Sequence, residues 1–156
     1  MKLVEIDAIQ RARQRIAPAV RVTPLVLASS ADAWAHLWIK CENLQAGGAF
    51  KLRGGVVYLH ELMRREPGLR GVISATRGNH GQSIALAAVR HGVEVTIVVP
   101  HGNSVEKNAA MRALGATLIE HGEDFQQSRE HAAQLAAERG LHMVPSFHRD
   151  LVRGVA

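Results

Sequence analysis

The chain has 156 residues, enough for one ordinary domain, and its apolar (47%) and charged (21%) fractions are those of a globular protein. The net charge of +5 does not indicate a nucleic-acid partner, because acidic residues interrupt the basic ones and aromatic residues make up only 4%. The single cysteine, Cys41, excludes an intramolecular disulfide and fits a reducing cytoplasm, where we expect the protein. No apolar run is long enough to cross a membrane, and the N-terminus lacks the apolar core of a secretory signal.

Hydrophobic spacing predicts that helices and short strands alternate along the chain. Before residue 50 we expect a helix over 4–16, an extended segment over 23–27, a short helix from Ala28 to about Ala35 and a strand over 37–41. The predicted order then continues with helix 50–65, strand 71–75, helix 79–91, strand 93–99, helix 104–114, strand 117–120, helix 123–139 and strand 142–144. This alternation predicts an α/β fold of three layers, with a parallel sheet buried between helices.

The stretch from Glu42 to Gly55 has the pattern of a turn that leads into a helix. Gly47 and Gly48 leave room for another group to approach the backbone. Lys51 follows in the first helical turn, where the positive end of the helix dipole disfavours an ammonium ion. A lysine that is easily neutralised is a nucleophile for aldehydes. Most lysines at such positions are only solvated, so the neighbouring motifs must decide between the two interpretations.

A second loop, from Ser74 to Gln82, follows a predicted strand and opens a predicted helix. Free backbone amides and the helix dipole make such a place an anion site. The alternative is a simple glycine turn in which Asn79 caps the helix. Arg77 in this loop either grips a carboxylate or is only solvated. The nine histidines show no metal-binding spacing, and we expect no metal.

Several motifs, taken together, resemble the fold-type II pyridoxal-phosphate enzymes, and within them the serine/threonine dehydratase (threonine ammonia-lyase) branch. Thr23-Pro24-Leu25 resembles the TPL opening of these enzymes, and the run Ala49-Phe50-Lys51 followed by Arg53-Gly54 resembles their cofactor-lysine motif. Gly78-Asn79-His80-Gly81-Gln82 resembles their GNHxQ loop. Val98-Val99-Pro100, Lys107 and Gly115-Ala116 follow in the order and spacing of the family. The resemblance extends from about Val22 to Ala156, and several motifs in order are more specific than any one of them.

The resemblance implies the cofactor pyridoxal 5′-phosphate, held as a Schiff base by Lys51. It also implies that Phe50 packs near the cofactor ring and that Asn79 donates a hydrogen bond to its phenolic oxygen. The loop that would hold the substrate carboxylate comprises Thr76, Arg77, Gly78, Asn79 and His80. The implied activity is conversion of L-threonine or L-serine to a 2-oxo acid and ammonia. The rival interpretation is a non-catalytic α/β binding or interaction module.

In the family's terms, residues 1–54 belong to an incomplete larger domain that carries the cofactor lysine. Residues 55–145 form the smaller domain of the tryptophan-synthase-β-like fold, and residues 146–156 begin the return to the larger domain. The family's glycine-rich phosphate loop is absent from these 156 residues. We therefore expect this chain alone to bind the cofactor weakly and to be inactive.

Two positions depart from the family's pattern. Ala49 and Arg77 stand where the family often has serine, and the second serine moves a proton in the racemase branch. An arginine does not release its proton at physiological pH, so Arg77 argues against racemisation. The expected partners are a small hydroxy amino acid and further copies of the chain, with no nucleic acid and no membrane.

Overall fold

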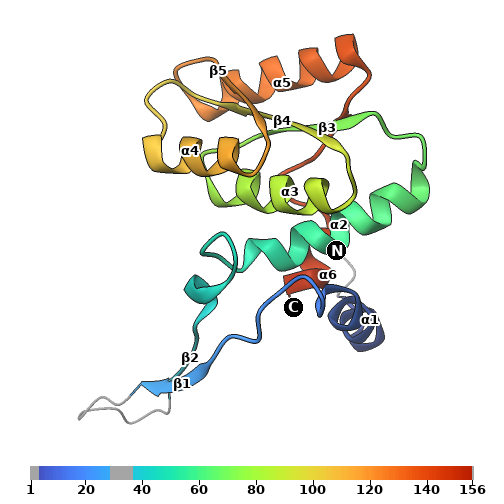
Figure 1. Cartoon of the computed structure of the whole chain (residues 1–156), viewed down its shortest axis with the longest axis vertical. Coiled ribbons are helices and arrows are strands. Elements are labelled where there is room, and N and C mark those ends of the chain that lie inside the picture. Colours follow the sequence, from blue (N-terminus) through green and yellow to red (C-terminus); the bar gives the residue numbers. More distant parts are fainter. Residues whose placement is uncertain (1–3, 29–36, 156) are drawn as a thin grey trace.

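The computed structural model describes residues 4–28 and 37–155, and its centre is a four-stranded parallel sheet (Figure 1). The strand order is β5-β4-β3-β6, and every neighbouring pair is parallel. The strands are β3 (Gly71–Ala75), β4 (Glu94–Val99), β5 (Thr117–Glu120) and β6 (His142–Met143). The α/β architecture predicted from the sequence is confirmed.

Helices cover both faces of this sheet (Figure 1). They are α2 (Lys51–Arg65), α3 (Asn79–Arg90), α4 (Val105–Ala113) and α5 (Phe125–Arg139). Successive side chains of a strand point to opposite faces. Accordingly, Val72 of β3 belongs to the larger core with α2 and α3, whereas Ile73 belongs to a smaller core with Leu135 of α5. The near-continuous apolar sequence of β3 and β4 follows from this burial on both faces.

Most helix ends are where the sequence predicts them. Ser104 accepts a hydrogen bond from the amide of Lys107 at 3.3 Å and so caps α4. Gly140 ends α5 in the left-handed conformation, with φ of 62°. The alternative that Asn79 caps α3 is wrong. Gly78 occupies the cap position, so Asn79 is already the first helical residue.

The first 50 residues contain α1 (Ile6–Ile16), a ribbon of two antiparallel strands and a short 3₁₀ helix, η1 (Glu42–Leu44). The ribbon strands are β1 (Leu25–Ala28) and β2 (Leu37–Lys40). The helix predicted to start at Ala28 is wrong at that residue, because Ala28 pairs with Leu37 as the last residue of β1. The remainder of that prediction lies outside the described residues.

A helix that the sequence analysis did not predict, α6 (Arg149–Val155), packs across α2. Glycines allow the close approach: a Cβ on Gly54 would lie 2.5 Å from the carbonyl oxygen of Leu151, and one on Gly154 would collide with the carbonyl oxygen of Arg53. Since α2 runs unbroken from Lys51 to Arg65, the predicted boundary at residue 55 falls inside a helix. Over residues 4–28 and 37–155, no helix combines the length and apolar character needed to span a membrane.

Candidate active site

Lys51 opens α2 and lies at the wall of an open cavity of about 260 Å³. The turn before it needs glycine, because Gly47 and Gly48 have φ of 79° and 67°. Phe50 precedes the helix and lines the same cavity, with 46% of its surface exposed. The other residues that line the cavity are Gly54, His80, Ser146, Phe147, Leu151, Val152 and Val155.

The loop before Lys51 is held by a hydrogen-bonded ion pair. Arg53 donates from Nε and Nη2 to the two carboxylate oxygens of Glu42, at 2.7 Å each. Thr23 donates its hydroxyl proton to the same carboxylate at 2.5 Å. The hydrogen bond from Arg53 holds the pKa of Glu42 below its ordinary value, despite the opposing effect of burial. The motif residues Thr23, Glu42 and Arg53 therefore fix the backbone on both sides of the lysine.

Gln45 ties this loop to the segment after α1. Its side-chain oxygen accepts from the amide of Arg21 at 2.9 Å, and its side-chain nitrogen donates to the carbonyl of Arg21 at 2.6 Å. Gln45 is 3% exposed, so both bonds are shielded from water. The sequence analysis matched this glutamine only as part of a pattern. In the structure it connects the lysine loop to the backbone of Arg21.

The second predicted loop joins β3 to α3. The hydroxyl oxygen of Thr76 accepts a hydrogen bond from the amide of Gly78 at 3.1 Å and shapes the turn. Thr76, Gly78 and His80 are buried, whereas Arg77 and Asn79 are exposed. The amides at the start of α3 thus lie beside two exposed polar side chains.

Residues at the start of α3 lie against the start of α2. Ser83 donates its hydroxyl proton to the carbonyl oxygen of Lys51 at 2.6 Å. His80 lies three residues before Ser83, on the same side of the helix, and lines the cavity with Lys51. Burial, and to a lesser degree the charge of Lys51, lower the pKa of His80 to about 4. His80 is therefore neutral at physiological pH.

Three of the predicted site residues, Lys51, Phe50 and His80, line one cavity. The loop residues Thr76, Arg77, Gly78 and Asn79 are near in sequence to His80 but do not line it. Sequence reasoning missed the opposite wall, which Ser146, Phe147 and three residues of α6 supply. No motif marked these residues, because an apolar wall can be made from many side chains.

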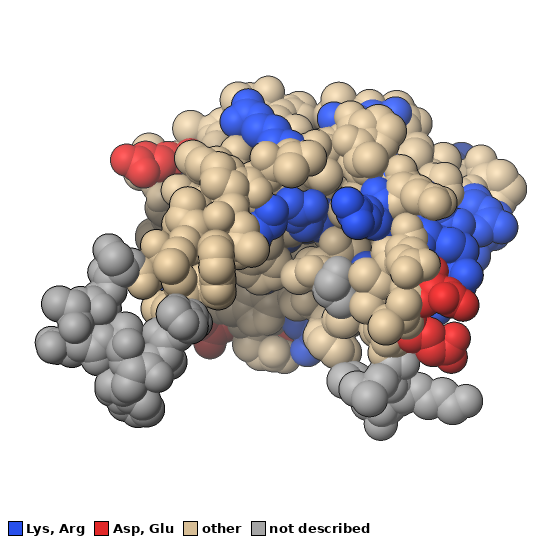
Figure 2. Space-filling model, turned by 90° about the horizontal axis from the view of Figure 1, so that it is seen from below, with Lys and Arg blue, Asp and Glu red and all other residues tan. Residues whose placement is uncertain are grey.

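A larger hollow of about 430 Å³ lies beside this cavity, between α1, the lysine loop and α6. Figure 2 shows the hollowed underside of the molecule, where Lys and Arg side chains gather. The hollow is lined by Arg13, Arg21, Lys40, Arg53 and Arg153, with Glu42 as its acid. Of these two hollows, the smaller one is the candidate site, because Lys51 lines it and does not line the larger one.

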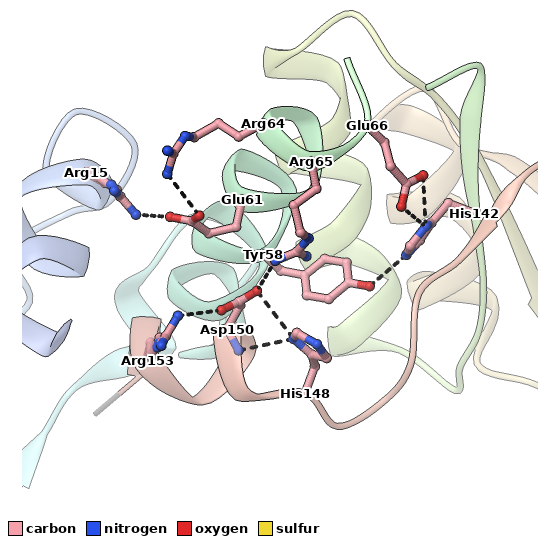
Figure 3. A network of polar contacts seen from close by, with 10 residues as sticks. All are labelled: Arg15, Tyr58, Glu61, Arg64, Arg65, Glu66, His142, His148, Asp150 and Arg153. Carbon is pink, nitrogen blue, oxygen red and sulfur yellow. Dashed lines mark hydrogen bonds and ion pairs between the residues drawn. The ribbon is translucent and has the colours of Figure 1, made fainter. Parts of the chain in front are cut away.

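A polar network on the other side of α2 holds β6 and α6 in place (Figure 3). Asp150, 3% exposed, accepts hydrogen bonds from Arg65 and Arg153, both at 2.9 Å. Tyr58 lies 2.9 Å from Nε2 of His142, whose Nδ1 lies 3.1 Å from Glu66. Burial raises the pKa of Tyr58 to about 12, so its hydroxyl stays protonated. With the proton on its Nδ1 directed at the Glu66 carboxylate, His142 accepts the hydrogen bond from Tyr58 at Nε2. Within the described residues, His, Cys, Asp and Glu form no group of three that could hold a metal ion.

Comparisons with known proteins agree with this geometry. The family model for pyridoxal-phosphate dependent enzymes matches residues 16–156. The biosynthetic L-threonine dehydratase of Haemophilus influenzae is 34% identical over 94% of this chain. Among solved structures, a pyridoxal 5′-phosphate-dependent aspartate racemase superposes with a TM-score of 0.92 and 31% identity over 99% of the chain. The processed form of threonine deaminase isoform 2 from Solanum lycopersicum gives 0.81 and 31% over 97%.

The chain belongs to the family of pyridoxal-phosphate dependent enzymes, and the resemblance seen in its motifs is confirmed. It spans 29% of the length of the threonine dehydratase, 49% of that of the racemase and 46% of that of the deaminase. The family's cofactor is pyridoxal phosphate. The substrate differs among the similar proteins, as their names show.

The residues at the cavity fit one end of this cofactor. Lys51 offers an amine to an aldehyde, and the aromatic and apolar wall with Phe50 suits a flat ring. His80 Nε2 is buried and has no hydrogen-bond partner in the described part of the chain, so a polar group of a ligand can still complete it.

Proposed function

We propose that this chain supplies the lysine and the carboxylate loop of an ammonia-lyase that converts L-threonine or L-serine to a 2-oxo acid and ammonia. The observation that carries the proposal is the placement of Lys51 and His80 in one cavity, with Ser83 bonded to the backbone of Lys51. This arrangement brings a reactive amine next to the helix start that suits an anion. The threonine dehydratase and threonine deaminase among the similar proteins support the choice of reaction.

When bound, pyridoxal phosphate supplies an aldehyde and a ring that draws electrons away from the substrate's α-carbon. Lys51 would hold the cofactor through that aldehyde, and its amine, when free, would take the substrate's α-proton at Nζ. Amides at the start of α3 would hold the substrate carboxylate, Asn79 would donate to the cofactor, and Phe50 would pack near its ring. The α-proton taken at Nζ and the departing β-hydroxyl would together make one water molecule, and a second water molecule would hydrolyse the resulting 2-amino-alkenoate to the 2-oxo acid and ammonia.

Two other functions compete with the ammonia-lyase: racemisation and non-catalytic binding. Racemisation, named for three structural neighbours, would need a second proton carrier opposite Lys51. Arg77 stands at the position of the family's serine and cannot serve, because a guanidinium keeps its proton. A non-catalytic binding module is the second rival, since the chain spans less than half of the dehydratase, the aspartate racemase and the deaminase. The division at residues 54 and 145, the cytoplasmic location and a homo-oligomeric state also stay predictions.

The lysine assignment is tested on the 156-residue chain itself. We expect excess pyridoxal phosphate followed by borohydride to label Lys51 as the main product, because among the lysines that the structure describes only Lys51 combines the glycine turn, the helix start and the cavity. Lys40 and Lys107 are the internal controls, and Lys51→Ala should remove the absorbance band seen on adding the cofactor. Principal labelling of either control lysine would contradict the assignment and favour the binding module.

A further inference from the structure

A buried serine joins the helix that carries Lys51 to the helix that follows the second loop. Ser83 of α3 is 3% exposed and donates its hydroxyl proton to the carbonyl oxygen of Lys51 at 2.6 Å. Within the described ranges, 4–28 and 37–155, no other hydrogen bond connects α2 with α3. The relative placement of the two helices at this end therefore depends on packing and on this one bond.

The direction of this bond is uncommon for a serine inside a helix. Such a hydroxyl usually faces water or bonds back to a carbonyl one turn earlier in its own helix. Ser83 does neither, because it is buried and its bond crosses to α2. The carbonyl of Lys51 can accept this bond, since a carbonyl oxygen has two lone pairs and the α-helix uses only one of them.

The facing helix leaves room for this hydroxyl. Gly55 lies one turn after Lys51 in α2, and a Cβ there would collide with the hydroxyl oxygen of Ser83 and lie 2.9 Å from its carbonyl oxygen. Glycine is unfavourable in the interior of a helix. At the point where Ser83 reaches the Lys51 backbone, α2 therefore carries a residue that the hydrogen bond needs and that the helix alone would not favour.

The bond acts on a separation that the proposed reaction needs. The amine of Lys51 would take the α-proton, while amides at the start of α3 would hold the carboxylate. In an amino acid the carboxylate and the α-carbon are directly bonded, so the amine and these amides must keep a fixed separation. Ser83 lies three residues after His80, which lines the cavity together with Lys51.

We propose that Ser83 is a positioning residue, which acts through the backbone carbonyl of Lys51 to hold the lysine amine at a fixed place relative to the start of α3. The inference rests on the proposed function, because it takes Lys51 as the reactive amine. A displacement of about 1 Å at a reacting group can lower a rate by roughly a hundredfold, so one bond beside the lysine affects how fast that lysine reacts.

The test measures how fast pyridoxal phosphate, trapped with borohydride, labels Lys51 in the 156-residue chain. Lys40 in the same sample is the reference. Ser83→Ala removes the hydroxyl and keeps the helix, and we expect it to lower the ratio of Lys51 to Lys40 labelling about fivefold, which corresponds to about 1 kcal/mol. Without cofactor, the ¹³C signal of the Lys51 carbonyl should shift in this variant. An unchanged carbonyl signal would show that the bond is absent and would overturn the inference.

Two further variants separate the hydrogen bond from packing and from stability. Ser83→Cys keeps a side chain of similar size over Gly55 but is a weak donor, so its labelling ratio should fall as in Ser83→Ala. Ser128→Ala is the matched control, because Ser128 on α5 is also buried and donates to a backbone carbonyl, that of His121, at 2.8 Å. We expect the control to keep the labelling ratio. A ratio restored by the cysteine, or an equal fall in the control, would overturn the role of Ser83.

The remaining outcomes separate this inference from the proposed function. Principal labelling of Lys51 at the same ratio with and without the Ser83 hydroxyl would overturn the positioning role and leave the lysine assignment intact. Principal labelling of Lys40 in the unsubstituted chain would overturn both.

Discussion

At the scale of single residues, the carboxylate of Glu42 holds the loop that leads into Lys51. It is the one group that Thr23 and Arg53 both contact, so it joins the segment before β1 to the first turn of α2. These motif residues form a brace, because the side chains of Thr23 and Arg53 both donate to the carboxylate of Glu42.

We predict that Glu42→Gln lowers the free energy of unfolding by about 1.5–3 kcal/mol, the contribution of a hydrogen bond to a charged group. The reason is that Arg53 would keep its partly buried charge without a counter-ion. Urea denaturation measures the change. Glu120→Gln is the control, since Glu120 pairs with Arg112 on the surface at 3.2 Å and should change stability little. Equal losses in the two variants would contradict the brace.

His80 should make stability depend on pH in a defined window. Its pKa is lowered from 6.5 to about 4 in the folded chain, so between these values the unfolded state binds a proton and the folded state does not. Stability is therefore full above pH 6.5 and falls as pH drops toward 4. We expect a loss of roughly 2 kcal/mol between pH 7.5 and pH 5.

Thermal or urea unfolding at several pH values checks this prediction, with His80→Gln as the variant that does not titrate. The variant should show a much flatter profile between pH 7.5 and 5. Glu42, whose pKa is also lowered, contributes only nearer and below its ordinary value of 4.5, so it does not confuse this window. An unchanged slope in the variant would show that other groups cause the loss.

At the scale of elements, α6 completes the cavity wall and depends on two glycines for its place. A side chain at Gly154 would meet the backbone of α2, which cannot move aside as a flexible side chain can. We predict that Gly154→Ala destabilises the chain by about 1–3 kcal/mol through this overpacking. Gly68→Ala, where a Cβ meets nothing within 4 Å, should have almost no effect. Calorimetry on the pair measures both.

The hydrogen bonds around Tyr58 form a second connection between α2 and the C-terminal part of the chain (Figure 3). Tyr58→Phe removes the hydroxyl donor and leaves His142 Nε2 without its partner. We expect a loss of about 1 kcal/mol, the usual net contribution of one hydrogen bond. Hydrogen exchange should show faster exchange at β6 in the variant. Slower or unchanged exchange there would show that the bond does not hold β6.

The sequence predicted the sheet and its helices well, and the reason is physical. Strands such as β3 and β4 are buried on both faces, and their apolar runs are bounded by glycine and proline, so the pattern is unambiguous. The short helix predicted from Ala28 does not form at that residue, because the pairing of Ala28 with Leu37 in the ribbon outweighs its local helix propensity. The helix α6 went unnoticed, since its packing depends on Gly54, nearly 100 positions earlier. Lys51 and His80 were both found, but their common cavity needed tertiary structure.

At the scale of the whole molecule, exposed apolar side chains collect on one side. The strands β1 and β2 present six of them, between 44% and 60% exposed: Leu25, Val26, Leu27, Leu37, Trp38 and Ile39. Phe50, Phe147 and Val155 are also exposed, next to the cavity and the basic hollow. Consecutive apolar residues on both faces of a ribbon are typical of strands that lie inside a sheet. Exposed apolar surfaces of this kind are typical of interaction sites.

We predict that the 156-residue chain alone is a weak cofactor binder and an inactive dehydratase, because it lacks contacts for the cofactor's phosphate. The Lys51 cavity is the proposed place for the aldehyde end of the cofactor, and the only basic side chains that line it are Lys51 and neutral His80. A phosphate normally receives several hydrogen bonds from amides or cations, each worth about 1.5–3 kcal/mol. Because each factor of ten in affinity is about 1.4 kcal/mol, the loss of two or three such bonds weakens binding by orders of magnitude.

Two measurements test the prediction together. Sedimentation should show self-association through the open edges of β1 and β2, and Trp38→Lys should reduce it by placing a charge on the ribbon. Val105→Lys is the control, because Val105 is 82% exposed on α4, away from that surface. The chain is also assayed with saturating pyridoxal phosphate and threonine for 2-oxobutanoate. Turnover near the common enzyme value of about 10 per second would show that the residues described here form a complete site, because a site lacking its phosphate contacts cannot hold the cofactor in the reacting geometry at that rate.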